Sequence, residues 1–471
     1  MGRRFLFLDD DDFFELIGLT KTMHQPVKHP DNPVVERTGE WERVLITLYG
    51  SVILDEGLYR MWYFCHCGRL DAQVRIGDRP HGPEVTGYAE SDDGVHWRKP
   101  TLGLVAFEGS TENNIVPLGI KNVEGPVIIR DVRDPDPKRR YKAFWNDHIS
   151  GLPGMHSDDG LLLGRDEEDG MFVAFSADGI QWDHFAGNPV LETYSDCSHQ
   201  MVFDEGLGKY VAYGRMGSGA RKVSRTESDD FINWSKPELV LETDDADGYG
   251  AQFYSMSVFI YEGMYVGFPW LFPQRFRDTR SHGNDDRIYA QLACSRDGIK
   301  WRRLGNRQPF IPNGPPEAFD GGIIYTGTQP VILDDRILIY YGAQMWPHRK
   351  PGREDHQPRG IGLATLRRDG FISVDAGDDE GELVTNPFEV TPDMTMHVNV
   401  DAPDGQVHAK LADVKSCEPI AEAAPSTTVS GDHLDAELTW PAETLQTLAG
   451  KTVGARICLR RAQLYSYWFS P

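Results

Sequence analysis

The sequence predicts an all-β protein, a five-bladed β-propeller followed by a C-terminal β-sandwich. Three observations predict this fold: a short turn motif that recurs along the chain, a hairpin of apolar and aromatic residues upstream of each copy, and a change to alternating strands after residue 375. Helical periodicity is almost absent before residue 440. Repeats of this length are typical of radial or stacked architectures, so the motif decides the fold.

The recurring motif has the form Ser-x-Asp-Gly-x-x-Trp, a tight turn that leads into a tryptophan. The third copy has Phe231 at the glycine position, and the fifth copy has Ser373 where the tryptophan should be. The copies occupy residues 91–97, 176–182, 228–234, 295–301 and 368–373. A tryptophan present in every unit cannot converge on a single site, so we expect it to pack between units.

Each copy follows an apolar strand, a Gly or Asp turn and an aromatic-rich strand. These pairs of runs are 51–55 with 59–63, 127–131 with 140–145, 200–204 with 209–213, 257–261 with 264–268, and 330–334 with 337–341. A third strand precedes the motif, and the tryptophan lies on a short fourth strand. Four strands in each of five units predict a five-bladed propeller over residues 41–375.

The two ends of the chain differ from the repeats. Residues 1–40 are rich in proline and histidine, and we expect an irregular lead-in to the ring. Residues 376–471 carry alternating strands, such as 394–400 and 434–440, in place of aromatic hairpins. This texture predicts an appended β-sandwich of ordinary domain size.

Composition restricts the classes of function. The 471 residues are 40% hydrophobic and 11% aromatic, as in folded globular proteins. The net charge of −24 argues against nucleic acid or an anionic membrane as a partner, and it favours a neutral or cationic ligand. Surface acidification for solubility remains the favoured explanation of the charge itself.

The cysteines and the apolar runs bear on the cellular compartment of the protein. The six cysteines fit neither a disulfide scaffold nor a zinc site, so we expect buried free thiols. The apolar run at the N-terminus is too short for a signal peptide, and no run reaches transmembrane length. We expect a cytoplasmic protein, or one whose leader has been removed. No cofactor and no catalytic metal are expected, although the channel of a propeller could hold a structural Ca²⁺.

The start of the first strand in each blade lies at one end of the propeller axis, here called the mouth. Aligning the blades places four candidate catalytic carboxylates there: Glu42, Glu124, Asp196 and Asp320. Asp196 is the strongest, since it stands in a polar run where no turn requires an aspartate. Converging carboxylates raise each other's pKa, which suits a general acid, and two of them can cleave a glycosidic bond. Arg133-Asp134-Pro135, by contrast, lies between two strands and predicts a turn.

Binding residues should be aromatic or planar polar groups near the same mouth. Aromatic faces stack on sugar rings, and Arg, His and Gln hold hydroxyl groups. The candidates are His199, Arg215, Gln252, Tyr254, Trp270 and His348.

The turn motifs, the Tyr-Arg-Met-Trp-Tyr strand and the strand at 462–467 resemble the five-bladed propeller glycoside hydrolases, the group of families 32, 43, 62 and 68. The sandwich resembles family 32 most. In that family an Arg-Asp-Pro and a Glu-Cys carry the stabilising and acidic groups. The resemblance implies that Glu124 and Asp196 take these two places, without the Arg and with Asp for Glu. The family's blade-one motif is missing, and Thr47 stands at its aligned position.

These observations predict a glycoside hydrolase that acts on a furanoside, such as a fructoside or an arabinoside, or on another glycoside, within an oligo- or polysaccharide. Glu124 serves as stabiliser or base and Asp196 as acid, with Asp320 or Glu42 as the remaining carboxylate. Two alternatives stay open: a non-catalytic carbohydrate-binding propeller and a glycoside phosphorylase. Retention or inversion, and the oligomeric state, stay open as well.

The first prediction concerns Asp196. The substitution Asp196→Asn should abolish turnover of glycosides while the far-UV circular dichroism and the thermal midpoint stay close to those of the wild type. Full activity in this variant would exclude Asp196 from catalysis.

Overall fold

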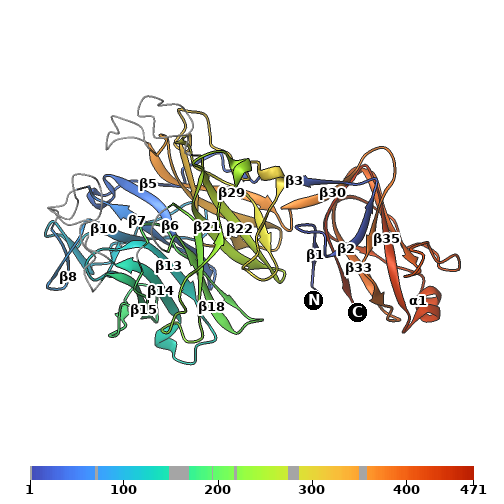
Figure 1. Cartoon of the computed structure of the whole chain (residues 1–471), viewed down its shortest axis with the longest axis horizontal. Coiled ribbons are helices and arrows are strands. Elements are labelled where there is room, and N and C mark those ends of the chain that lie inside the picture. Colours follow the sequence, from blue (N-terminus) through green and yellow to red (C-terminus); the bar gives the residue numbers. More distant parts are fainter. Residues whose placement is uncertain are drawn as a thin grey trace.

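The computed structural model describes residues 3–68, 73–147, 169–193, 195–216, 220–273, 286–348 and 358–471. It is all-β, with a five-bladed β-propeller and a second, nearly closed antiparallel sheet, which confirms the predicted fold class. In Figure 1 the propeller lies on the left and the second sheet on the right, joined by strands β3 (Thr20–Met23) and β30 (Ile372–Ala376).

Each blade is an antiparallel sheet whose strands run outward from the axis in chain order. Blade 1 contains β6 (Leu45–Asp55), β7 (Leu58–His66), β10 (Glu84–Ser91) and β12 (Ile115–Val116). Blade 2 contains β13 (Glu124–Arg130), β14 (Tyr141–Asp147), β15 (Gly170–Ser176) and β16 (Asp183–His184). Blade 3 contains β17 (Gln200–Asp204), β18 (Lys209–Gly214), β19 (Val223–Ser228) and β20 (Glu238–Leu241).

The last two blades carry extra short strands. Blade 4 contains β21 (Gln252–Tyr261), β22 (Met264–Phe272), β23 (Tyr289–Ala290), β24 (Ala293–Ser295) and β25 (Arg302–Arg303). Blade 5 contains β26 (Ile323–Thr326), β27 (Val331–Ile332), β28 (Arg336–Gln344) and β29 (Arg359–Arg367). A small sheet of β8 (Val74–Ile76), β9 (Arg79–His81) and β11 (Val105–Phe107) accompanies blade 1.

The N-terminal segment closes the ring. Strands β4 (Val27–Lys28) and β5 (Val35–Glu36) pair with β29 and complete the outer edge of blade 5. The expected irregular lead-in is therefore wrong in this part of the chain. The start of the chain thus supplies the outermost strands of the last blade, and these strands connect the two ends of the propeller.

The recurring motif is a hydrogen-bonded turn, and a side chain of the preceding blade donates a hydrogen bond to one of its carbonyl groups. In the first copy, the Ser91 hydroxyl accepts the Gly94 N–H at 2.9 Å, and Asp93 accepts the N–H groups of Val95 and His96, both at 2.8 Å. Gly94 has φ +78°, a conformation that glycine adopts without strain. The Tyr340 hydroxyl of blade 5 donates to the Gly94 carbonyl at 2.7 Å.

The motif tryptophans pack between blades, as predicted. Trp97 meets Tyr340 with ring centroids 5.7 Å apart, and Trp301 meets Tyr213 at 5.9 Å. Each tryptophan thus contacts the second strand of the blade before it. The indole of Trp62 donates likewise to the Gly179 carbonyl of the next motif at 2.7 Å.

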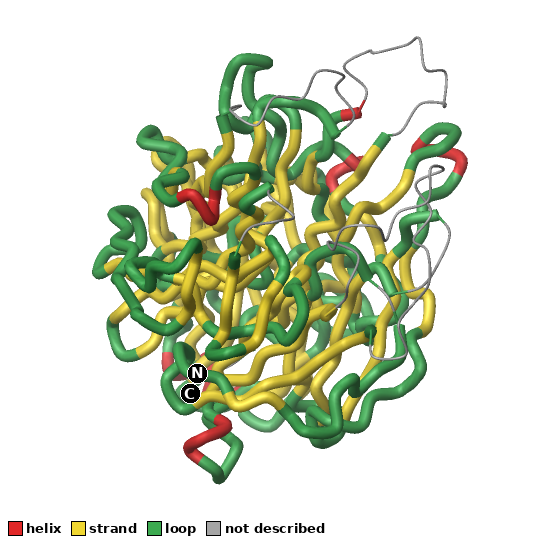
Figure 2. The backbone as a smooth tube through the Cα atoms, turned by 90° about the vertical axis from the view of Figure 1, so that its left-hand side faces the viewer, coloured by secondary structure: helices red, strands yellow, loops and turns green. Residues whose placement is uncertain are grey.

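The second sheet has ten strands and takes them from both ends of the chain. Its strands are β1 (Phe5–Leu6), β2 (Phe13–Ile17), β3, β30, β31 (Gly381–Thr385), β32 (Phe388–Glu389), β33 (Thr395–Ala412), β34 (Val429–Leu438), β35 (Thr452–Arg460) and β36 (Ala462–Ser470). Strand β1 pairs with β36, so the two termini lie side by side (Figure 2). The sheet predicted from residue 376 onward therefore includes N-terminal strands that the sequence analysis assigned to the lead-in.

Short helical turns and one helix complete the described residues. They are η1 (Glu40–Glu42), η2 (Pro137–Arg139), η3 (Asp245–Asp247), η5 (Gly305–Arg307) and α1 (Ala442–Leu448). Within the described ranges no helix has the length and apolarity to cross a membrane. All six cysteines are free, and five of them are buried, as expected.

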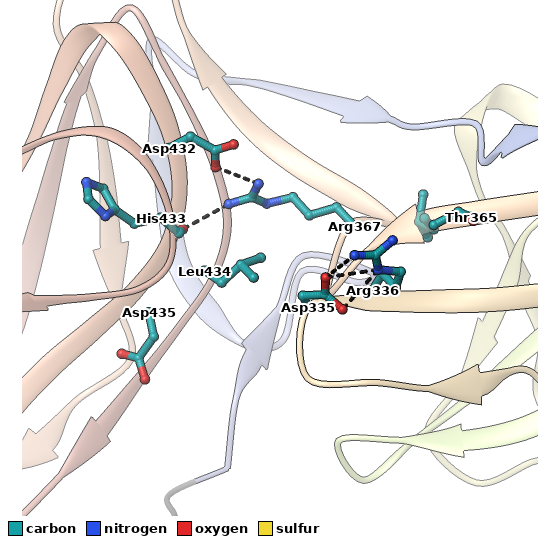
Figure 3. Close-up of a pocket in the computed structure, with 9 residues that line it drawn as sticks. Asp335, Arg336, Thr365, Arg367, Asp432, His433, Leu434 and Asp435 are labelled. Atoms are coloured by element: carbon teal, nitrogen blue, oxygen red, sulfur yellow. Dashed lines mark hydrogen bonds and ion pairs between the residues drawn. The ribbon is translucent and has the colours of Figure 1, made fainter. Parts of the chain in front are cut away.

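Arg367, at the end of β29, connects the propeller to the second sheet. Its guanidinium donates to Asp432 at 2.6 Å and to the His433 carbonyl at 2.9 Å, across a hollow of about 530 Å³ (Figure 3). Asp335 and Arg336 pair with each other on the propeller side of this hollow.

Asp369, in the decayed fifth motif, is a buried junction of three parts of the chain. Its carboxylate accepts from Arg4 at 2.7 Å, from the Ser466 hydroxyl at 2.6 Å, and from the Tyr261 hydroxyl of blade 4. The carboxylate is inaccessible to solvent. The motif has therefore exchanged its tryptophan for a charged contact with the second sheet.

Asp369→Asn should lower the free energy of unfolding by about 1–3 kcal/mol, because the Arg4 guanidinium loses its ionised partner. Asparagine tolerates the φ of +62° at this position, so the backbone is not at issue. The matched control Asp335→Asn removes an exposed pair and should change it by at most about 0.5 kcal/mol. Chemical denaturation measures both, and equal effects would contradict the role given to Asp369.

Candidate active site

Three tyrosines from three innermost strands meet on the propeller axis. Tyr49 of β6 and Tyr325 of β26 have ring centroids 5.0 Å apart, and Tyr254 of β21 lies 5.3 Å from Tyr325. Burial raises the pKa of Tyr49 well above its usual value, and Cys197 and Tyr254 beside it add to the shift. This buried aromatic cluster, Tyr49–Tyr254–Tyr325, forms the floor beneath the mouth.

Glu124 opens β13 beside this floor. It is 8% exposed, and the next residue, Gly125, has φ +58°. A side chain on Gly125 would lie 2.0 Å from the Cys197 carbonyl oxygen. Glycine therefore lets blade 2 approach blade 3 closely, and it brings Glu124 next to the segment that carries Asp196.

Glu84, which opens β10 in blade 1, is hydrogen-bonded to Glu124. Its backbone N–H donates to the Asn122 side-chain oxygen at 3.0 Å, and the Asn122 amide donates back to the Glu84 carboxyl. The His66 Nε2 atom lies 3.9 Å from the same carboxyl. Two carboxyl groups in direct contact require a shared proton, because two adjacent negative charges repel.

The protonation of this pair follows from its surroundings. Burial raises the pKa of Glu84 to about 8, while the hydrogen bonds from Glu124 and Asn122 oppose the rise. Burial also raises the pKa of Glu124 well above its usual value; the charge of Glu84 adds to the shift and Arg215 opposes it. Near neutral pH the pair therefore retains a proton at the mouth.

Asp196 has the opposite environment. Its side chain is 48% exposed and forms an ion pair with Arg215, which also donates to the Asp196 carbonyl at 3.3 Å. The Arg215 guanidinium lies 5.1 Å from the Tyr254 ring. The positive charge of Arg215 favours the ionised form of Asp196. The mouth thus presents a protonated carboxyl pair and an ionised carboxylate on neighbouring blades.

Three further predicted residues gather around the same floor. The Tyr254 hydroxyl and His348 Nε2 are 3.2 Å apart. Gln252, which opens β21, accepts a hydrogen bond from Arg221 at 3.0 Å. The structure therefore brings Glu124, Asp196 and Arg215 together with Gln252, Tyr254 and His348.

His199 lies beneath the mouth, inaccessible to solvent. Its Nδ1–H donates to the Gly125 carbonyl at 2.8 Å, and its ring meets Phe144 edge-on at 5.8 Å. Burial lowers the pKa of His199 to about 4, so the imidazole is neutral. The sequence analysis predicted that His199 contacts substrate. Instead, its hydrogen bond to Gly125 holds the backbone next to Glu124 in place.

Trp270 is also fully buried, since it packs under the floor. Its ring stacks on Tyr49 at 5.9 Å, and its N–H donates to the Thr326 hydroxyl at 2.8 Å. With no exposed surface it supports the floor, in place of the direct sugar contact that the sequence analysis predicted.

Glu42 and Asp320 do not reach the mouth with a free carboxylate. Glu42 is inaccessible to solvent and accepts from Lys99 at 2.7 Å and from the Tyr63 hydroxyl at 2.6 Å. Asp320 is 3% exposed and pairs with Lys28 of the closing strand β4 at 2.5 Å. Both were predicted as catalytic candidates, but their lysine partners give them structural roles. The sequence analysis did not predict these ion pairs.

Sequence reasoning missed Glu84, Asn122, His66 and Arg221. A signal for Glu84 existed: β10 runs antiparallel to β7, so a third strand begins at the same end of the blade as a first strand. Only the first strands were searched for carboxylates. Arg221 lies outside any strand, and no period marks it.

Potential metal ligands cluster away from this site. Among the described residues, Glu380, Glu382 and Cys458 of the second sheet have ligand atoms within 4.8 Å of one another. Arg456 already pairs with Glu382, which weakens the case for a cation there. A structural Ca²⁺ in the channel stays a prediction.

Comparison with known proteins gives distant similarity. No family model matches the chain. An uncharacterised protein of Mycobacterium tuberculosis, known from two strains, is 24% identical over 177 residues, or 36% of this chain. The match covers 47% of that protein, so the chain spans about half the length of the curated relatives it matches.

Solved structures resemble the chain at low identity. They include a putative glycoside hydrolase from Bacteroides ovatus (14% identity, TM-score 0.48, 74% of this chain and 98% of that one). An N-acetylgalactosamine deacetylase from F. plautii, solved with blood group B trisaccharide, has 16% identity and a TM-score of 0.45 over 75% of this chain and 97% of its own. A β-1,2-mannobiose phosphorylase from Listeria innocua has 11% identity and a TM-score of 0.45 over 72% and 96%. Similarity at this level carries no functional argument, so the function must be argued from the site.

The carboxyl pair makes the stability of the protein depend on pH. The unfolded chain ionises Glu84 near its ordinary pKa of 4.5, whereas the folded protein keeps the proton to about pH 8. Between these values the folded state binds a proton that the unfolded state has released, so raising the pH favours unfolding and the stability falls.

Glu84→Gln should flatten this fall between about pH 5 and about pH 8, because it removes one titrating group and the charge that raises the pKa of Glu124. Urea midpoints measured across this range for the variant and the wild type test this. Parallel curves for the two proteins would show that the pair does not share a proton.

Proposed function

We propose that the protein is a carbohydrate-active enzyme that cleaves a glycosidic bond at the mouth of the propeller, with Glu124 as the general acid. The observation that carries the proposal is the contact between the buried carboxyl groups of Glu84 and Glu124, because burial and this contact raise the pKa of Glu124. A general acid must be protonated at the working pH, and burial with a second carboxyl beside it achieves this.

Asp196 supplies the complementary carboxylate. Because it is half-exposed and paired with the Arg215 guanidinium, it serves as the nucleophile or as the base that activates water. This assignment reverses the roles that the sequence analysis gave to Glu124 and Asp196. It rests on their environments, one buried against a carboxyl and the other exposed beside a guanidinium.

The reaction then follows from these groups. The Glu124 proton moves to the leaving oxygen as the bond between that oxygen and the anomeric carbon breaks. Asp196 stabilises the positive charge that develops on the sugar, or bonds to its anomeric carbon. The leaving sugar departs with that proton on its new hydroxyl group. Water then bonds to the anomeric carbon and displaces Asp196 where Asp196 is bonded there. A proton of this water returns to the carboxyl pair of Glu124 and Glu84, directly or by way of Asp196, so the enzyme is restored.

The surrounding residues suit a sugar ring. Tyr254 is buried at the floor, its hydroxyl lies beside His348 Nε2, and Gln252 stands at the start of the same strand. Aromatic and amide groups in this arrangement orient hydroxyl groups of carbohydrates. The resemblance to propeller glycosidases extends the proposal to a furanoside, such as a fructoside or an arabinoside.

Glu124→Gln should lower kcat about 100- to 10,000-fold on glycosides that need leaving-group protonation. Glutamine preserves the shape and the contact with Glu84 but cannot donate the proton. The measurement is turnover of a panel of aryl glycosides and oligosaccharides, first with the wild type and then with the variant.

Two controls accompany it. Glu238→Gln alters an exposed glutamate of β20, on the outer edge of blade 3, and should keep full turnover. Aryl glycosides with very good leaving groups should lose less activity in Glu124→Gln, because they need no acid. Saturable sugar binding without any turnover by the wild type would favour the non-catalytic propeller instead.

A further inference from the structure

Arg221 stands at the mouth without an acidic partner. It precedes β19, and its Nη1 atom donates to the neutral Gln252 side chain at 3.0 Å. Its guanidinium carbon lies 5.3 Å from the Tyr254 ring and 5.7 Å from the Phe272 ring. Among the residues that the structure describes, no carboxylate pairs with Arg221, and its Nε atom is shielded from solvent without a hydrogen-bond partner.

Many arginines that the structure describes have a carboxylate partner, although Arg60 is like Arg221 in donating to a neutral oxygen and lying against a tyrosine ring. Arg303 is held by Asp247 at 2.5 Å and Arg296 by Asp9 at 2.7 Å, as expected for a protein with 72 acidic and 48 basic residues. A guanidinium placed against aromatic faces and left without an anion is costly, because it has lost water and gained no opposite charge. Aromatic contacts and one amide compensate only in part.

Arg215 adds a second open donor on the same ring. Its guanidinium lies 5.1 Å from Tyr254, and although Asp196 engages one nitrogen, Nη1 is shielded and has no partner within the described ranges. Two guanidinium groups therefore lie against one tyrosine ring, and each has an N–H donor without a hydrogen-bond partner among the described residues. Donors that have no acceptor within the described residues are available to an anion that enters the mouth.

We infer that Arg221, together with Arg215, binds an oxyanion beside the catalytic carboxyls. The inference rests on the proposed function, since it defines the substrate of the same site. Guanidinium groups bind carboxylate and phosphate through paired hydrogen bonds, so the ligand is either the carboxylate of an acidic sugar or inorganic phosphate. The net charge of −24 had favoured a neutral or cationic ligand, but net charge describes the whole surface and not this position.

The two sources have different chemical consequences. An acidic sugar would be held by its carboxylate while Glu124 protonates the leaving oxygen and water completes the cleavage. Phosphate would take the place of that water: one of its oxygens bonds to the anomeric carbon, the glycosidic bond breaks, and the Glu124 proton goes to the leaving sugar. The products are then a sugar phosphate and a shortened saccharide, and no oxidation is involved.

Isothermal titration calorimetry on the whole chain tests the inference, with inorganic phosphate, glucuronate, galacturonate and neutral glucose as probes. We expect phosphate or a uronate to bind, and glucose to bind at least about tenfold more weakly. Arg221→Gln should weaken the anion about tenfold or more, and Arg221→Lys should recover part of the loss. The control Arg302→Gln removes an exposed arginine that pairs with Asp10 and should bind like the wild type.

The outcomes separate the sources and the two proposals. Binding of a uronate alone assigns an acidic sugar, and binding of phosphate alone, with sugar phosphate formed on turnover, assigns phosphorolysis. Glu124→Gln should still bind the anion, so binding without turnover by the wild type overturns the proposed function only. No anion binding, or equal binding by the wild type and Arg221→Gln, overturns the anion site even if neutral glycosides are cleaved.

Discussion

The five innermost strands converge on one axis, and the candidate site follows from that convergence. The aromatic rings of Tyr49, Tyr254 and Tyr325 fill the axis beneath the mouth. At the mouth itself, the first residues of the strands bring polar groups from different blades into contact. Gly125 makes the closest approach, since any side chain there would collide with blade 3. Because the ring fixes these positions, Glu84 and Glu124 cannot separate and must share a proton.

The same geometry divides the charges between blades. Blades 1 and 2 supply the buried carboxyl pair, while blade 3 supplies Asp196 and Arg215 in a more exposed position. One blade boundary therefore carries a proton donor and the next carries an ionised carboxylate. General acid catalysis needs a protonated group beside an ionised one, and packing between blades creates this contrast.

The repeats made the fold predictable, but they left the partners of single side chains undetermined. Hairpins and turn motifs mark the blades because every blade must solve the same packing problem, and Glu124, Asp196 and Tyr254 were found by aligning them. Glu42, slightly upstream of the aligned position in blade 1, and Asp320 were weaker candidates, and Lys99 and Lys28 pair with them. Those lysines reach across large sequence separations, and no local pattern announces such contacts. Glu84 escaped because it begins a third strand, and the strands before residue 40 were hidden by their proline-rich composition.

The central claim is that a carboxyl proton resides between Glu84 and Glu124 at neutral pH, and infrared difference spectroscopy observes it directly. The account predicts a protonated carboxyl band in the wild type that shifts in heavy water and is absent from the double variant Glu84→Gln/Glu124→Gln, because burial alone would keep a single remaining carboxyl protonated. The same band should titrate away only in the alkaline range, as burial of the pair requires. A spectrum with ionised carboxylates alone at neutral pH would contradict the account.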